Sequence, residues 1–195
     1  MWQLGPAWRD EPALAAAWRA AEPFPHLVID DFQPGGTLAR ILELLDDEHV
    51  DRYEADLFAF EATAPEPASE GLRALRDDFA RMLGPPLSRI TGTPVARADM
   101  RAYAYRPGHY LLPHSDHQDG LDRRLAYACY LPSPELPAGG ELELYRVAPD
   151  AITSAKLVAP RANRIAFFDV SDRSLHQVRE VTAGLRLSLA GWFYP

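Results

Sequence analysis

The segment 100–116 ends in a triplet, His114-Ser115-Asp116, whose two outer side chains could bind a metal ion. Alternate side chains of an extended chain point to the same face, so the imidazole of His114 and the carboxylate of Asp116 would project together. Such a pair supplies two of the three ligands of the facial triad that binds non-haem Fe(II) and leaves neighbouring coordination positions free. A lone His-x-Asp triplet is also common in surface turns, so this pair needs support from the rest of the chain.

The candidate for the third ligand is His176, in the segment Ser174-Leu175-His176-Gln177-Val178. A facial site built on strands takes this ligand from a neighbouring strand that is remote in sequence, and His176 meets that requirement. The alternative is an ordinary hydrogen-bonded histidine on a half-buried strand.

Arg186 follows ten positions later in a segment of alternating apolar and polar residues. An arginine that points into a barrel is costly unless it meets an anion, and its planar fork suits a carboxylate. The alternative is a cross-strand ion pair with Glu180. We expect residues 182–184 to form a three-residue hairpin turn that pairs the strand of His176 with that of Arg186. One face of this hairpin would carry His176, Arg186, Ser188 and Trp192, and the other Leu185, Leu187 and Leu189.

Three tyrosines could line the same interior. Tyr103 and Tyr105 alternate with alanines, and Tyr130 follows Ala126 and Ala128 at spacings of two. Aromatic rings above small residues leave space inside a barrel and place phenol hydroxyls where they can donate to a ligand. The alternative is an ordinary core tyrosine, which is what we expect for Tyr103.

The elements that must position these residues fall into two halves. Alanine-rich composition predicts a helix over 13–21, and apolar spacings of three and four predict helices over 37–48 and 69–83. Gly84-Pro85-Pro86 should end the third helix. From residue 95 onward, the apolar residues alternate with a period of two, as is typical of strands. Strands are predicted over 27–29, 99–105, 111–116, 125–131, 141–146, 156–159, 164–169, 176–181 and 185–193, and a strand followed by a loop over 51–67.

Helices first and many short strands afterwards predict an α+β fold, with the helices on one side of an antiparallel sandwich or barrel. The length of 195 residues suits one domain with a sizeable core. We therefore expect a single domain over 1–195, with helical support mainly in 10–92 and the β core mainly in 95–194.

The composition excludes several classes of protein. A net charge of −8 argues against a nucleic-acid partner, which would require basic patches. Cys129 is the only cysteine, so no internal disulfide can form and a reducing compartment is expected. No signal peptide is visible, and no uncharged apolar run approaches the roughly 20 residues of a membrane span. The sequence thus predicts a cytoplasmic protein without a membrane or nucleic-acid partner, and leaves the oligomeric state open.

The ordered set of these residues resembles the Fe(II)- and 2-oxoglutarate-dependent dioxygenases of the prolyl 4-hydroxylase-like branch. This branch includes the egg-laying-defective-nine-type and ribosomal prolyl hydroxylases. The resemblance covers about residues 24–194 and implies a double-stranded β-helix, or jelly-roll, barrel with N-terminal helices on one sheet. It is carried by Tyr105, His114, Asp116, Tyr130, Gly139, Gly140, Leu142, His176, Arg186, Ser188 and Trp192.

The resemblance also implies a role for each residue. His114, Asp116 and His176 would bind Fe(II) and form the catalytic centre. Arg186 would pair with the C5 carboxylate of 2-oxoglutarate, and Tyr130 would donate to the same group. O2 would be the second cosubstrate, with ascorbate as a reductant. The further residues expected around the cosubstrate are Tyr105, Leu142, Ser188 and Trp192.

The expected reaction is hydroxylation of an unactivated C–H bond, with release of succinate and CO2. The leading substrate is a prolyl or similar residue in a peptide or protein; a free amino acid or small metabolite is the alternative. A non-catalytic metal-binding barrel remains a third hypothesis, and the same site could also desaturate or cyclise. Substrate choice should lie in the loops 51–67 and 117–124, where Arg123 and Arg124 could meet a carboxylate or a peptide backbone unless they are merely solvated.

Overall fold

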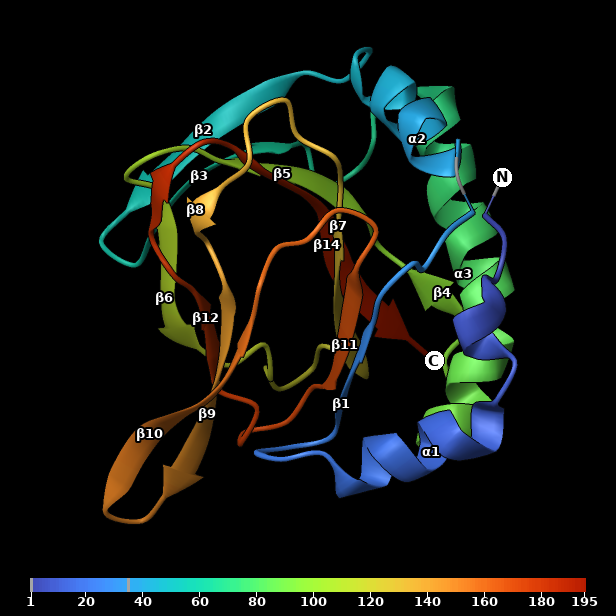
Figure 1. The fold of residues 1–195 in the computed structure, drawn as a ribbon, viewed down its shortest axis with the longest axis vertical. Coiled ribbons are helices and arrows are strands. Elements are labelled where there is room, and N and C mark those ends of the chain that lie inside the picture. Colours follow the sequence, from blue (N-terminus) through green and yellow to red (C-terminus); the bar gives the residue numbers. More distant parts are fainter. Residues whose placement is uncertain (1, 35) are drawn as a thin grey trace.

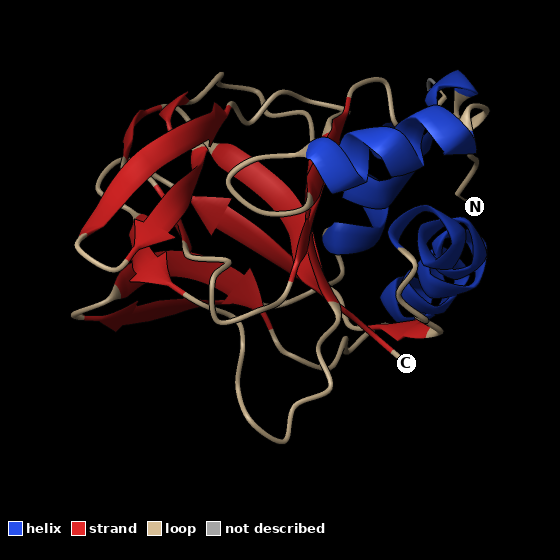
Figure 2. Ribbon diagram, turned by 90° about the horizontal axis from the view of Figure 1, so that it is seen from below, coloured by secondary structure: helices blue, strands red, loops and turns tan. Residues whose placement is uncertain are grey.

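The alternating residues of the second half, joined by three strands from the first half, form an antiparallel β-barrel in the computed structural model, which describes residues 2–34 and 36–195 (Figure 1). The main sheet runs in the order β1-β11-β7-β14-β5-β3-β6-β12-β9-β10, while β2 pairs with β3 and β4 with β14. A separate two-stranded sheet joins β13 and β8. The helices gather along one side of this barrel (Figure 2), which confirms the predicted arrangement of an α+β fold.

The strands are short, as the spacing of turn residues predicted. Their bounds are β1 His26–Ile29, β2 Val50–Ala55, β3 Phe58–Thr63, β4 Arg97–Ala98, β5 Arg101–Tyr105, β6 Tyr110–His114, β7 Leu125–Tyr130, β8 Ala138–Gly139, β9 Leu142–Ala148, β10 Ala151–Val158, β11 Ile165–Asp169, β12 His176–Val178, β13 Val181–Ala183 and β14 Arg186–Tyr194.

Helices α1 and α3 each begin at a residue whose side chain caps the helix. In α1 (Glu11–Ala20), the side chain of Asp10 accepts a hydrogen bond from the Ala13 amide, and in α3 (Glu70–Thr91) the Ser69 hydroxyl accepts one from Leu72. Such caps satisfy backbone N–H groups that have no partner within the helix. The other helices are the short 3-10 helix η1 (Pro6–Trp8) and α2 (Thr37–Leu45). No helix in the described part of the chain combines the length and hydrophobicity that crossing a bilayer requires.

The prediction that the third helix ends at Gly84 was wrong, because α3 continues through Pro85 and Pro86 to Thr91. A proline inside a helix costs about 3 kcal/mol or more. Beyond the prolines, however, Leu87 and Ile90 are buried in the core, and burial of such a side chain contributes about 1.5–3 kcal/mol. Tertiary packing therefore outweighs the local helix-breaking signal.

The predicted pairing of the last two long strands was also wrong. β12 pairs with β6 and β9, whereas β14 pairs with β5 and β7. Gly184 does take the expected positive φ of 71°, but the strand before it, β13, pairs with β8. The segment between β12 and β14 therefore crosses from one face of the barrel to the other instead of closing a hairpin.

The segment 51–67 contains a hairpin rather than a strand and a loop. β2 and β3 pair along their whole length, from Val50 opposite Thr63 to Ala55 opposite Phe58. Most of β2 is exposed, so its side chains show no regular apolar alternation that sequence patterns could detect.

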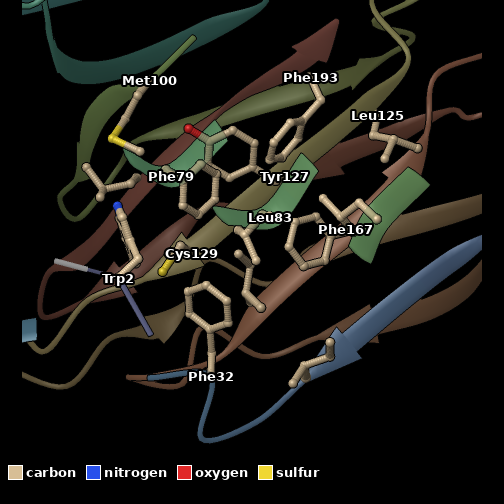
Figure 3. Packing of buried hydrophobic residues seen from close by; sticks show 14 of the residues in the cluster. Trp2, Phe32, Phe79, Leu83, Met100, Leu125, Tyr127, Cys129, Phe167 and Phe193 are labelled. Carbon is tan, nitrogen blue, oxygen red and sulfur yellow. The ribbon is translucent and has the colours of Figure 1, made fainter. Parts of the chain in front are cut away.

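The helices and the barrel share one large core. Strand β7 is buried on both faces: Tyr127 and Cys129 point toward the helices, and Ala126 and Ala128, which alternate with them, face the barrel interior. Phe79 of α3 lies at the centre of this interface, with ring centroids 4.8 Å from Tyr127 and 5.4 Å from Phe193 (Figure 3). The helices thus hold the outer face of the strands whose inner face lines the barrel.

We predict that Phe79→Ala lowers the free energy of unfolding by about 3–5 kcal/mol, because Phe79 is fully buried and its loss leaves a cavity. Urea denaturation followed by circular dichroism measures this change. Leu136→Ala is the matched control, since Leu136 is 86% exposed and its truncation should shift stability by no more than about 0.5 kcal/mol. Equal effects of the two substitutions would contradict the central place of Phe79.

Candidate metal centre and adjoining pocket

The pairing of β6 with β12 brings the three candidate metal ligands together. His176, the first residue of β12, lies directly opposite His114, the last residue of β6, and the two ring centroids are 4.3 Å apart. Asp116 follows β6 by two residues. Its Oδ1 lies 3.7 Å from Nε2 of His114, and its Oδ2 lies 3.5 Å from Nε2 of His176.

One potential donor atom from each of the three side chains lies within 4.8 Å of the others. In residues 2–34 and 36–195 this is the only cluster of three or more His, Cys, Asp or Glu with such geometry. Two imidazoles and one carboxylate match the donor set of a non-haem Fe(II) site. The residues present therefore fit a ferrous ion.

Backbone contacts select, for both imidazoles, the tautomer that suits metal binding. Nδ1 of His114 lies 2.9 Å from the carbonyl oxygen of Leu112, and Nδ1 of His176 lies 2.9 Å from that of Ser174. A carbonyl oxygen can only accept, so each Nδ1 carries a hydrogen, and in the neutral tautomer that this contact selects the Nε2 lone pair is free. Burial lowers the pKa of His176 to about 4, although the nearby carboxylate of Asp116 opposes this shift. His176 is thus neutral near pH 7, as a metal ligand must be.

A cavity of about 330 Å³ adjoins these ligands, and most of the residues predicted to contact the cosubstrate line it. Its walls include Tyr105, Leu142, Arg186, Ser188 and Trp192 together with the three candidate ligands. Tyr103, expected as ordinary core, also lines the cavity, and its ring lies 5.3 Å from that of Phe60.

Arg186 is a buried cation inside this cavity, with 3% of its surface exposed. Its guanidinium carbon lies 4.7 Å from the ring centroid of Tyr105 and 5.1 Å from that of Tyr130. Nη1 donates to the hydroxyl of Ser188 over 3.2 Å, but Nε has no hydrogen-bond partner. The alternative ion pair with Glu180 does not form, and no carboxylate in the described residues pairs with Arg186. A buried guanidinium without a counter-ion is expensive unless a ligand supplies the anion.

The two tyrosines beside Arg186 are protonated donors. Burial raises the pKa of both Tyr105 and Tyr130, although the charge of Arg186 opposes the shift. The Tyr130 hydroxyl is buried without a partner. Tyr130 is not part of the cavity wall and lies against Arg186 from the adjacent strand β7. A phenol and a guanidinium with unused N–H and O–H donors can bind one carboxylate together.

Of the adjacent glycines Gly139 and Gly140, the second packs close to the side chain of Arg186. Gly139 and Gly140 both take positive φ, 78° and 70°. A Cβ on Gly140 would lie 2.9 Å from Cδ of Arg186 and 2.8 Å from Cγ2 of Val181, closer than side chains tolerate. This backbone therefore has to be glycine for the Arg186 side chain to keep its place.

The outer part of the cavity is formed by residues from the two segments, 51–67 and 117–124, that were expected to affect substrate choice. Phe58 and Phe60 of β3 line it, and so does Arg123 from the segment after Asp116. The Arg123 guanidinium carbon lies 3.5 Å from the ring centroid of Trp192, and its Nη1 donates to the carbonyl oxygen of Asp116 over 3.2 Å. Its Nε is buried without a partner.

Arg124 follows the alternative of a solvated loop charge. Arg124 is not part of the cavity wall and lies 3.6 Å from Asp122 on the surface. Sequence analysis missed Leu111, Phe168 and Val178, which also line the cavity. The sequence signal for them is weak, because they alternate within strands like any core residue.

We predict that His176→Ala weakens Mn(II) or Fe(II) binding by at least about 100-fold, since even the outer partners of metal ligands typically contribute ~10–100-fold. Anaerobic titration calorimetry measures this affinity. His117→Ala is the matched control: His117 is half exposed beside Asp119 and lies outside the cluster. Undiminished metal binding by His176→Ala would rule out this centre.

Comparison with known proteins agrees with this geometry. A sequence model described as the 2OG-Fe(II) oxygenase superfamily matches residues 100–194. Prolyl 3-hydroxylase OGFOD1 of Mus musculus is 35% identical in an alignment 189 positions long, which covers 89% of this chain and 33% of that protein. The chain spans about a third of the length of the curated relatives it matches.

Solved structures share the fold at lower identity. A Pseudomonas putida prolyl-4-hydroxylase has a TM-score of 0.70 and 20% identity, covering 93% of this chain and 98% of its own. A Trichoplax adhaerens prolyl hydroxylase, solved with a hypoxia inducible factor peptide fragment, has a TM-score of 0.72 and 14% identity, covering 96% and 90%. The jelly-roll prediction is thus confirmed, and this chain belongs, through residues 100–194, to the 2OG-Fe(II) oxygenase superfamily.

Proposed function

We propose that this chain is an Fe(II)- and 2-oxoglutarate-dependent hydroxylase that acts on a prolyl or similar residue of a peptide or protein. The observation that carries the proposal is the buried guanidinium of Arg186, which has no carboxylate partner in the described residues and shares a cavity with the His114, Asp116 and His176 cluster. A metal site alone does not need a desolvated cation beside it, whereas a dicarboxylate cosubstrate does.

The metal and the cosubstrate would supply the oxidation. His114, Asp116 and His176 would hold Fe(II), which with 2-oxoglutarate and O2 supplies oxygen insertion into an unactivated C–H bond while the oxoacid leaves as succinate and CO2. Ascorbate would serve as a reductant. The single cysteine suits a cytoplasmic, reducing location, which would also keep iron ferrous.

The chain itself would bind and orient the cosubstrate. The Nε–H of Arg186 and the hydroxyl of Tyr130 are both buried and unused, so together they can take the distal carboxylate of the oxoacid. The hydroxyl of Ser188 holds Nη1 of Arg186 in place. Tyr105 and Leu142 are almost fully buried and would keep water away from this ion pair, which strengthens it.

The outer cavity suits a compact apolar group attached to a polar backbone. Phe58, Phe60 and Trp192 provide apolar walls, and the buried Nε–H of Arg123 has no acceptor. A saturated prolyl ring with its peptide carbonyl combines these two properties. The names of the relatives, prolyl 3-hydroxylases, and the peptide complex of the Trichoplax protein support a prolyl peptide as the substrate.

Two alternative functions can be distinguished from the proposed peptide hydroxylase. A free amino acid or small metabolite would use the same inner residues and differ only in the outer cavity. A non-catalytic metal-binding barrel is disfavoured, because it would leave the desolvated charge of Arg186 without a purpose.

Cosubstrate turnover tests the inner site. We predict that the protein with Fe(II), ascorbate and O2 forms succinate from 2-oxoglutarate without a primary substrate, and that His114→Ala abolishes this reaction. Arg186→Ala should raise the KM for 2-oxoglutarate by about 10–100-fold, because the lost hydrogen bond from Nε to a charged carboxylate contributes about 1.5–3 kcal/mol.

The same assay contains its own controls. Arg106→Ala should not change the KM, because Arg106 is exposed and paired with Glu61. Wild-type protein should strongly prefer 2-oxoglutarate to 2-oxobutyrate, which lacks the distal carboxylate, and Arg186→Ala should lose most of this preference. A preference that survives in Arg186→Ala would show that the carboxylate binds elsewhere.

The primary substrate can be found by mass spectrometry. We predict that proline-containing peptides incubated with the protein and its cosubstrates gain the mass of one oxygen atom on a prolyl residue, and that free proline and other free amino acids do not. His176→Ala protein provides the control incubation. A product with two hydrogens fewer would indicate desaturation or cyclisation, and oxidation of free amino acids alone would favour the metabolite alternative.

A further inference from the structure

The carboxylate of Asp99 uses both of its oxygens to hold the end of strand β14. Asp99 lies between β4 and β5, outside the cavity wall. The Trp192 amide donates to Oδ1 over 2.5 Å, and the Tyr194 hydroxyl donates to Oδ2 over 2.9 Å. The Asp99 amide in turn donates to the carbonyl oxygen of Trp192 over 3.1 Å. The Tyr127 hydroxyl, anchored in the main core, donates to the Asp99 carbonyl oxygen over 2.8 Å.

The close approach of this carboxylate depends on a glycine. A Cβ on Gly191 would overlap Oδ1 of Asp99 and would lie 2.7 Å from its carbonyl oxygen. Gly191 has no positive φ that would itself require glycine. The fold therefore keeps residue 191 small so that the Asp99 carboxylate can reach the backbone of Trp192.

The residues held by Asp99 form the outer wall of the pocket. The guanidinium carbon of Arg123 lies over the Trp192 ring, 3.5 Å from its centroid. The charge of Arg123 lies close enough to oppose the effect of burial, which raises the pKa of both Asp99 and Tyr194. Arg123 is thus held by the Trp192 indole on one side and by the hydrogen bond from its Nη1 to the Asp116 carbonyl oxygen on the other.

We propose that Asp99 is a positioning residue for substrate binding: through the Trp192 amide and the Tyr194 hydroxyl, it fixes the Trp192 indole and the Arg123 guanidinium at the pocket mouth. The group this wall would receive is a hydrogen-bond acceptor, such as a peptide carbonyl, because the Nε–H of Arg123 is buried without a partner. The catalytic consequence rests on the proposed function, but the positioning itself does not.

A purely structural role makes different predictions. If Asp99 only stabilised the fold, its removal would lower the stability and leave the native pocket unchanged. If it positions the wall, its removal changes the exposure and mobility of Trp192 in protein that is still folded. None of the hydrogen bonds of Asp99 reaches the three metal-ligand candidates or Arg186. In the described residues, the wall is hydrogen-bonded to the inner site only where Arg123 donates to the backbone oxygen of Asp116, not to its carboxylate, so the inner site should respond little.

Tryptophan fluorescence can report this wall almost selectively. The chain has four tryptophans, and Trp2, Trp8 and Trp18 are only 3%, 4% and 5% exposed. Trp192 is half-buried in the cavity wall, so a neutral quencher such as acrylamide should reach mainly its indole. Subtracting the signal of Trp192→Phe in each background isolates this contribution.

We expect Asp99→Ala to raise the acrylamide quenching constant of Trp192 by about twofold or more, because two hydrogen bonds that hold this segment are lost. Asp99→Asn should stay close to wild type, since its amide keeps an acceptor for the Trp192 N–H and can donate to the Tyr194 oxygen. Gly191→Ala should resemble Asp99→Ala, because the new methyl group displaces the carboxylate. Asp10→Ala, which removes a carboxylate bonded to a backbone amide at the start of α1, is the matched control and should leave quenching unchanged.

A rise in quenching for Asp10→Ala equal to that for Asp99→Ala, or no rise for folded Asp99→Ala, would overturn the proposal. Succinate formation without a primary substrate gives the second readout. It should remain within about twofold of wild type in Asp99→Ala, because the metal and oxoacid residues keep their contacts. A parallel loss of this activity would place Asp99 in the inner site and contradict a role at the mouth. Absence of succinate in the wild type would count against the proposed function alone, since the quenching result would still decide the positioning role.

Discussion

The desolvated charge of Arg186 is the constraint on which the rest of the barrel interior depends. A guanidinium that is 3% exposed and lacks a carboxylate partner can persist only where surrounding groups limit its cost. Two aromatic faces, those of Tyr105 and Tyr130, and the hydroxyl of Ser188 provide this support. Each comes from a strand paired with β14 or from β14 itself, so sheet register rather than loop conformation sets the environment of the charge.

Register in a second ladder, that of β6 with β12, positions the metal-ligand candidates. His176 lies opposite His114 in a β ladder, and both rings are locked by Nδ1 contacts to carbonyl oxygens two residues earlier in the chain. Their Nε2 atoms therefore converge on Asp116 before any ion binds. A site whose ligands are held by backbone geometry loses little conformational entropy when a metal arrives.

The sequence indicated which donor side chains could meet, but not how the strands that carry them are connected. The His-x-Asp triplet, His176 and Arg186 could be selected because donor types and alternation are local properties of the chain. The true partners of β12 and β14 could not be selected in this way, because a positive φ at Gly184 is compatible both with a hairpin and with a crossing between sheets. The faces of Arg186 and Ser188 were nevertheless predicted correctly, because alternation along β14 does not depend on which strand is its neighbour.

Residues of the outer pocket were harder to predict for a related reason. Phe58 and Phe60 alternate on β3 as core residues do, and only the pairing of β3 with both β5 and β6 turns them toward the cavity. Asp99 gave no sequence signal at all, since its effect arises from contact with a strand end remote in the chain. Local patterns thus identify residues whose chemistry is unusual, such as a buried arginine, whereas residues that shape a substrate pocket are defined by tertiary neighbours. For this reason, the inner site of such a barrel can be inferred from sequence, while the selection of a primary substrate depends on contacts that appear only in the folded chain.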